Sequence, residues 1–187
     1  NMNKPLFAKL AVIAALGAIG TFAASANAAT ATGTNTFKVT MTITSACNIS
    51  TAPSDISLGS AVASTTAITN SGNNTFKVTC SKGTPFYIGL LPSSANGGTS
   101  AGTGNMTTAD ALPGNTDKVP YTLYSNAGLT QVWGNTATTT SVGNGMSGTG
   151  AGMATGNAVS FTAYAQATNS NFTPDSYADT VTVTVNY

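Results

Sequence analysis

The chain has no histidine, no arginine and no glutamate among its 187 residues, and its charged side chains are six Lys and five Asp. Charged residues make up 6% of the sequence, against about 25% in an ordinary globular domain. Without histidine, the chain lacks the most common general base and the most common metal ligand. A formal net charge of +1 does not supply the basic patch that nucleic-acid binding needs. We therefore expect no enzyme, no cofactor, no metal site and no nucleic-acid partner.

Threonine and glycine are abundant instead, with 34 Thr and 20 Gly. Thr and Val favour strands, and no segment after residue 28 has a helical period. Short alternating segments predict an all-β sandwich. The expected strands cover residues 36–44, 55–58, 74–81, 86–91, 119–124, 129–133, 159–166 and 177–187. Gly72, Asn73 and Asn74 form a predicted turn, and the Gly-rich stretches 93–115 and 143–156 are expected to be exposed loops.

The first 28 residues have the pattern of a secretory signal peptide. Lys4 and Lys9 precede an apolar run from Leu10 to Phe22, and Ala26-Asn27-Ala28 fits a cleavage site. The alternative is a membrane anchor, but this run is shorter than the ~20 residues that a spanning helix needs. We expect cleavage before Ala29, export, and no membrane span in the mature chain.

Export bears on the two cysteines, Cys47 and Cys80, which both lie after the predicted signal peptide. In an oxidising compartment, two cysteines most often form a disulfide. Two free thiols are the alternative.

The two ends of the predicted mature chain alternate strongly between apolar and polar residues. The first segment, TFKVTMTIT, places Phe37, Val39, Met41 and Ile43 on one face, and the last strand does the same with Val181, Val183, Val185 and Tyr187. A last strand without a neighbour exposes an edge to which another chain can add a strand. The first segment of one copy could pair with the last strand of another.

Four segments together resemble the spore coat protein U (SCPU) domain family, the pilin type of archaic chaperone–usher pili such as the Csu pili. They are Phe37 to Cys47, Phe76 to Cys80, the Tyr121-Thr122-Leu123-Tyr124 segment with Val132-Trp133-Gly134, and Tyr177 to Tyr187. They extend from one end of the predicted mature chain to the other.

The resemblance implies an incomplete immunoglobulin-like β-sandwich that a donor strand from another subunit completes. It implies a donor extension over residues 29–45, a pilin domain over 46–187 and a disulfide between Cys47 and Cys80. The acceptor groove would have the strand from Val181 to Tyr187 at one edge and the strand after Cys47 at the other. The implied partners are identical or related pilin subunits, a periplasmic chaperone and an outer-membrane usher.

The function implied by the resemblance is a structural subunit of a surface pilus, exported through the periplasm and used in attachment and biofilm formation. One alternative is a spore-coat or secreted matrix protein of the same fold. Another is a carbohydrate-binding adhesin module in which Tyr121, Tyr124 and Trp133 stack on a sugar, although aromatic residues on neighbouring sandwich strands more often belong to the core.

Overall fold

The computed structural model describes residues 32–109 and 113–187, and the expected signal peptide lies outside them. The chain divides into two units, Asn1–Met41 and Thr42–Tyr187. Residues 32–46 contain neither helix nor strand. The strand expected over 36–44 is therefore not formed by the single chain. An alternating segment becomes a strand only when another strand pairs with it, and this segment has no such neighbour in the described structure.

Nine strands and two short 3-10 helices make up the described part of the second unit, which contains no α-helix. This confirms the all-β prediction. The strands are β1 (Cys47–Thr51), β2 (Asn70–Cys80), β3 (Pro85–Pro92), β4 (Thr103–Thr108), β5 (Val119–Tyr124), β6 (Met146–Thr149), β7 (Val159–Ala167), β8 (Tyr177–Ala178) and β9 (Val181–Asn186). The 3-10 helices are η1 (Ser94–Asn96) and η2 (Thr155–Asn157).

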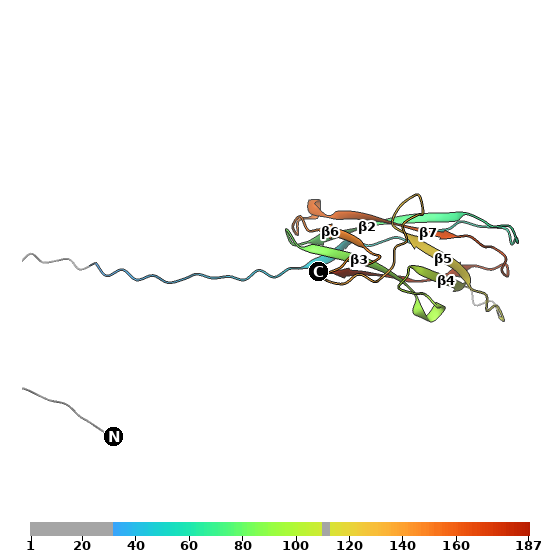
Figure 1. Ribbon diagram of the computed structural model, residues 1–187, viewed down its shortest axis with the longest axis horizontal. Helices are drawn as coiled ribbons and strands as arrows, with labels where there is room; N and C mark the ends of the chain where they lie inside the picture. Colours follow the sequence, from blue (N-terminus) through green and yellow to red (C-terminus); the bar gives the residue numbers. More distant parts are fainter. Residues whose placement is uncertain (1–31, 110–112) are drawn as a thin grey trace, which may run out of the picture. The chain divides into compact units, whose positions relative to one another are not determined.

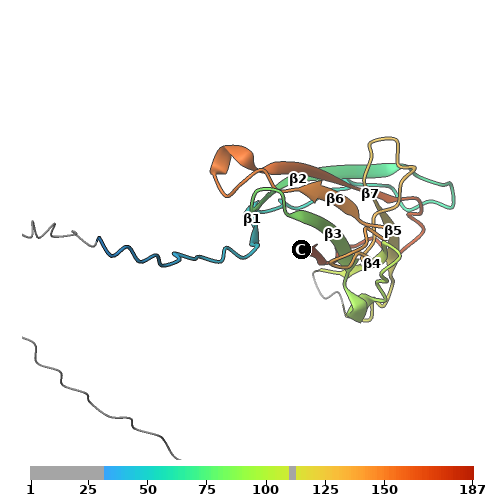
Figure 2. The same cartoon turned by 60° about the vertical axis from the view of Figure 1, so that its left-hand side comes forward.

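The strands form two antiparallel sheets, seen in Figures 1 and 2. The larger has the order β1-β2-β7-β5-β4-β8, and the smaller has the order β6-β3-β9. Alternate residues of the long strands bury one face of each sheet, as the period of two predicts. Phe86 of the smaller sheet meets Phe161 of the larger sheet edge to face, with ring centroids 5.9 Å apart. The sheets therefore pack as a sandwich around one aromatic core.

A disulfide joins Cys47 and Cys80, which confirms their pairing. The two residues lie opposite each other in the ladder between β1 and β2. Cys80 is fully buried in the core cluster. The disulfide therefore fixes the edge strand β1 to the long strand β2, just after the end of the extension.

The turn predicted at residues 72–74 is wrong, because β2 runs through these residues and pairs with β7 from Asn70 onward. Gly72 is needed for packing here. A Cβ at this position would overlap the carbonyl oxygen of Ser57, so the missing side chain lets another backbone segment pass close to the strand.

The two Gly-rich stretches are not simple loops. The first contains η1 and β4, and the second contains β6. Gly104 of β4 faces Tyr121, whose ring atoms would lie within 2.7 Å of an added Cβ. Glycine therefore replaces the apolar residue that would have revealed this strand in the sequence.

Two expected strands are absent from the described structure. Residues 55–58 are not a strand, and residues 129–133 contribute a single bridge between Tyr124 and Val132. The strand expected over 177–187 is divided into β8 and β9, because the chain leaves the larger sheet at Asp179 and Thr180 and joins the smaller one.

Candidate functional site

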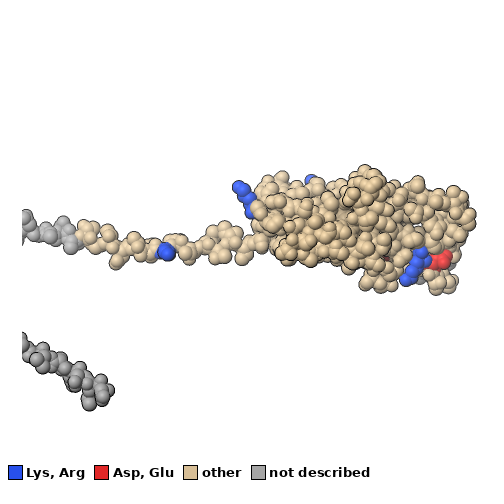
Figure 3. Space-filling model, viewed as in Figure 1, with Lys and Arg blue, Asp and Glu red and all other residues tan. Residues whose placement is uncertain are grey.

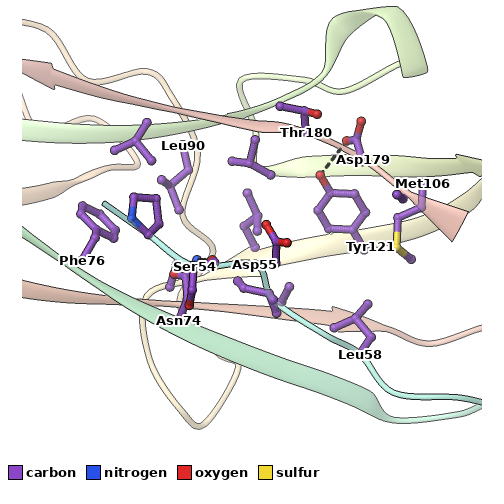
Figure 4. Close-up of a pocket in the computed structure, with 18 of the residues that line it drawn as sticks. Ser54, Asp55, Leu58, Asn74, Phe76, Leu90, Met106, Tyr121, Asp179 and Thr180 are labelled. Atoms are coloured by element: carbon purple, nitrogen blue, oxygen red, sulfur yellow. Dashed lines mark hydrogen bonds between the residues drawn. The ribbon is translucent and has the colours of Figure 1, made fainter. Parts of the chain in front are cut away.

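A cavity of about 490 Å³ opens between residues 53–58 and the segment from Tyr177 to Val183. Its floor is apolar and comes from both sheets, as Figure 4 shows in part. The floor residues are Phe76, Leu90, Leu123, Ala163 and Ala165. The cavity is open to solvent, and its volume lies within the range of about 300–1,000 Å³ that is usual for binding clefts.

A second cavity of about 480 Å³ continues the first. The two share Ile56, Leu58, Met106 and Tyr177 in their linings. The two cavities therefore adjoin each other, and we call them together the groove. Residues 53–58, which we call the groove wall, lie along it.

The groove wall lies alongside β2 but is not part of the sheet. Ile56 and Leu58 pack against the core, whereas Asp55 and Ser57 are exposed. In the described structure no backbone–backbone hydrogen bond involves residues 53–58. Apart from the carbonyls of Ser54 and Leu58, which accept side-chain hydrogen bonds, the backbone groups of this segment are thus available to another strand.

Two Asn side chains of β2 hold the groove wall in place. Asn70 Nδ2 donates to the carbonyl of Leu58 at 2.8 Å, and Asn74 Nδ2 donates to the carbonyl of Ser54. The other amide atom, Asn74 Oδ1, is buried without a hydrogen-bond partner in the described residues. These side-chain bonds explain why residues 55–58 lie along β2 without forming a sheet ladder.

The opposite side of the groove is β9. It pairs with β3 along one edge, and no strand of the described residues pairs with its other edge. Val181 and Val183 line the groove, and Val185 packs against the core. Tyr187 lies just after β9 and is 48% exposed.

Tyr121 and Asp179 fix the point where the chain changes sheets. The Tyr121 hydroxyl donates to Asp179 Oδ2 at 2.7 Å, and Asn96 Nδ2 donates to Asp179 Oδ1 at 2.6 Å (Figure 4 shows the first bond). Burial and this carboxylate raise the pKa of the Tyr121 hydroxyl well above its ordinary value. The hydroxyl therefore stays protonated and acts as a hydrogen-bond donor.

Two more carboxylates hold the far end of the groove in place. Asp175 accepts hydrogen bonds from Thr108 Oγ1 at 2.6 Å and Asn115 Nδ2 at 2.7 Å, which lower its pKa. Asp117 accepts one from the backbone N–H of Thr173 at 2.7 Å, which also lowers its pKa. Both carboxylates are held ionised as hydrogen-bond acceptors.

The four residues predicted to form the donor face are all exposed in the described structure. The exposed fractions of Phe37, Val39, Met41 and Ile43 lie between 79 and 88%. These four large apolar side chains lie in alternate positions. A row of exposed apolar side chains of this kind is typical of a surface that binds another molecule.

The sequence did not reveal several residues of the groove. No sequence pattern predicts the roles of Asp179, Asn70 and Asn74. An Asn in an alternating strand has no feature that indicates which distant backbone it will contact.

The sugar-stacking alternative is wrong for two of its three residues. Trp133 is 1% exposed and Tyr121 is 6% exposed. The indole Nε1 of Trp133 donates to the carbonyl of Ile88 at 2.9 Å inside the core. Neither ring offers a face on which a sugar could stack.

Charge is sparse on the surface, as Figure 3 shows for one face. No group of three or more metal-ligating side chains occurs in the described residues. No helix within residues 32–109 and 113–187 is long and apolar enough to cross a membrane.

Comparison with known proteins agrees with the resemblance seen in the sequence. The family model of the Spore Coat Protein U domain matches residues 33–184. No curated protein matches the chain. One similar solved structure is the CsuC-CsuE chaperone-tip adhesion subunit pre-assembly complex from archaic chaperone-usher Csu pili of Acinetobacter baumannii, with 19% identity and a TM-score of 0.49. The match covers 78% of this chain and 41% of that chain.

Proposed function

Because this chain belongs to the Spore Coat Protein U domain family, we propose that it is a structural pilin subunit that polymerises by donor-strand exchange. In this proposal residues 29–45 are the donor extension and residues 46–187 form the acceptor domain. The observation that carries the proposal is the complementarity between two parts of the chain. An open groove with an apolar floor has an unpaired strand edge on one side, and an exposed segment carries apolar side chains in every second position.

The lengths of the two parts agree. The seven residues from Phe37 to Ile43 extend over about 20 Å at ~3.3 Å per residue. The strand β9 has six residues, and the groove wall has a similar length. A strand placed between them could bond to β9 on one side and to the groove wall on the other, which would close the groove.

Burial supplies the driving force for this insertion. Each large apolar side chain that moves from water into the groove contributes about 1.5–3 kcal/mol. The main-chain hydrogen bonds with β9 add strand pairing along the whole segment. Ordering the segment opposes these gains. The gain is largest when all four side chains of this face point inward.

The same groove requires protection before assembly, since an open apolar groove beside a free strand edge promotes aggregation. We propose that a periplasmic chaperone fills the groove first and that the donor extension of the next subunit replaces it at an outer-membrane usher. The product is a cell-surface pilus for attachment and biofilm formation. A structural role is consistent with the involvement of Asp117, Asp175 and Asp179 in hydrogen bonds that hold the fold.

The test compares two neighbouring residues of the extension. Met41 is 82% exposed and Thr40 is exposed as well. Replacing either by Asp should leave the single subunit equally stable. In the assembled fibre Met41 points into the groove and Thr40 points to solvent. Met41→Asp should therefore block fibre growth, because burying an unpaired carboxylate is costly, while Thr40→Asp should allow it.

Fibres are counted by electron microscopy after co-expression of the full chain with its chaperone and usher. Deletion of Ala29 to Thr44 is the stronger perturbation, and it should keep chaperone binding while abolishing extension. Equal assembly of the Met41→Asp and Thr40→Asp chains would contradict the proposal and would favour a secreted matrix or spore-coat protein of the same fold.

A further inference from the structure

The donor extension carries one charge. Lys38 is the sole charged side chain among the described residues 32–46, and it is exposed without a hydrogen bond or ion pair there. It lies between Phe37 and Val39, so it belongs to the face opposite the apolar one. When the apolar face enters a groove, the Lys38 ammonium group stays on the solvent side of the inserted strand.

The two segments that flank the groove also carry one charge on their solvent side. Asp55 lies in the groove wall directly before Ile56, which packs against the core, and it is exposed at the groove opening. The rest of the wall and all of β9 are uncharged, and the outward residues of β9 are Thr182, Thr184 and Asn186. Figure 4 shows Asp55 beside the groove.

The other described carboxylates are already engaged. Asp117, Asp175 and Asp179 accept the hydrogen bonds described above, whereas no hydrogen bond or ion pair involves the Asp55 carboxylate in the described structure. Asp55 is thus an available acceptor for a cation that arrives with the inserted strand.

We propose that Lys38 of one subunit pairs with Asp55 of the next, and that this ion pair adds to the preference of the inserted strand for one register. The inference rests on the proposed donor-strand exchange. Cross-strand neighbours on one face lie about 4.5–5.5 Å apart at Cβ, which is within reach of a Lys–Asp pair.

The sequence of β9 alone does not define one register for the inserted strand, because its residues repeat with a period of two. Its sequence VTVTV presents the same face at every second residue. An inserted strand can slip in steps of two residues and keep its apolar face inward. A slip by one step would place Thr36 or Thr40 opposite Asp55 and would leave Lys38 without its partner. The slip also takes Ile43 or Phe37 out of the groove and brings Asn35 or Ser45 to an inward position, so the ion pair and the apolar face favour the same register.

The direct test uses a zero-length carbodiimide, which couples an amine and a carboxylate only where they touch. Fibres are assembled from a mixture of isotope-labelled and unlabelled subunits, treated with the reagent, digested and examined by mass spectrometry. The expected product is an amide between Lys38 and Asp55 that joins labelled to unlabelled chains. Asp55→Asn fibres should lose this product and keep the others. Coupling of Lys38 to a different carboxylate, or no coupling of Lys38 in intact fibres, would overturn the inference.

A second measurement follows the rate of exchange. Lys38→Glu should slow strand exchange about two- to five-fold at low salt, the effect expected of an exposed pair, and added salt should reduce the difference. Adding Asp55→Lys in the acceptor should restore the rate, and failure of this rescue would count against the ion pair.

A chain that forms no fibres at all would contradict the proposed function itself, whereas fibres without the Lys38–Asp55 contact would contradict only the ion pair.

Discussion

The Tyr121 hydroxyl donates a 2.7 Å hydrogen bond to the Asp179 carboxylate at the place where the chain passes from the larger sheet to the smaller one. β8 ends at Ala178 and β9 begins at Val181. The bond therefore determines where β9 begins and where its unpaired edge meets the groove. The same carboxylate holds the Asn96 side chain and the Ser93 N–H, so one residue ties three segments together.

Removing the hydroxyl should destabilise the domain. Tyr121→Phe should lower the free energy of unfolding by about 1.5 kcal/mol, at the low end for a bond to a charged group because Asp179 is partly exposed. Urea unfolding followed by tryptophan fluorescence measures the change. Tyr124→Phe is the matched control, since no hydrogen bond involves the Tyr124 hydroxyl in the described structure, and it should be close to neutral. Equal losses of unfolding free energy in the two variants would show that the hydrogen bond to Asp179 does not stabilise the domain.

The raised pKa of Tyr121 predicts a loss of stability in alkali. The unfolded tyrosine ionises near its ordinary pKa of 10.0, and the folded one ionises at a higher pH. The stabilising contribution is therefore complete below pH 10 and decreases as the pH rises above it. The stability difference between the wild type and Tyr121→Phe should shrink above pH 10 in reversible unfolding experiments. A difference that stays constant to higher pH would contradict this account of the hydroxyl.

The lowered pKa of Asp175 predicts the opposite dependence at the acid end. The carboxylate stabilises the fold above its ordinary pKa of 3.8, and this contribution is lost as the pH falls through the lower folded value. Asn115→Ala removes one donor, so the acid-unfolding midpoint should move to higher pH. Asn171→Ala is the control, because no hydrogen bond involves its side-chain amide in the described residues. A midpoint that both substitutions move equally would argue against the Asp175 contact.

Gly72 should be sensitive to a single methyl group. An added Cβ would overlap the carbonyl oxygen of Ser57, so Gly72→Ala must displace the groove wall. We expect a loss of about 1–3 kcal/mol in unfolding, as in other overpacked sites, and slower fibre growth. Gly156→Ala is the control, because nothing lies within 4 Å of its added Cβ. Normal stability and normal assembly of Gly72→Ala would show that the wall moves freely.

The alternation of apolar residues revealed the long strands because each of them buries one face. β3, β5 and β7 begin and end within one residue of the predicted bounds. β4 has the sequence TGNMTT and was missed, because a glycine takes the inward position opposite the Tyr121 ring. Such a strand is recognisable only once its neighbour is known.

The groove could be predicted in part. The valines of β9 were identified from their alternation, and the structure places Val181 and Val183 in the groove lining. The groove wall was expected to be a strand, but it is held by Asn70 and Asn74 instead. These bonds join residues far apart in the sequence. Local sequence patterns could not reveal them. An Asn that is exposed to solvent and an Asn that bonds to the groove wall occur in the same kind of alternating sequence.

The donor role of residues 36–44 stays a prediction. Their alternation predicts a strand, and the described structure shows an exposed segment with no strand partner. The two observations agree if the partner is another molecule.

Electron microscopy of the assembled fibre at side-chain resolution tests the central claim most directly. The predicted density shows Phe37, Val39, Met41 and Ile43 of one subunit in the groove of its neighbour, between β9 and residues 53–58. An empty groove, a groove filled by the extension of the same subunit, or fibres joined through other surfaces would contradict the account.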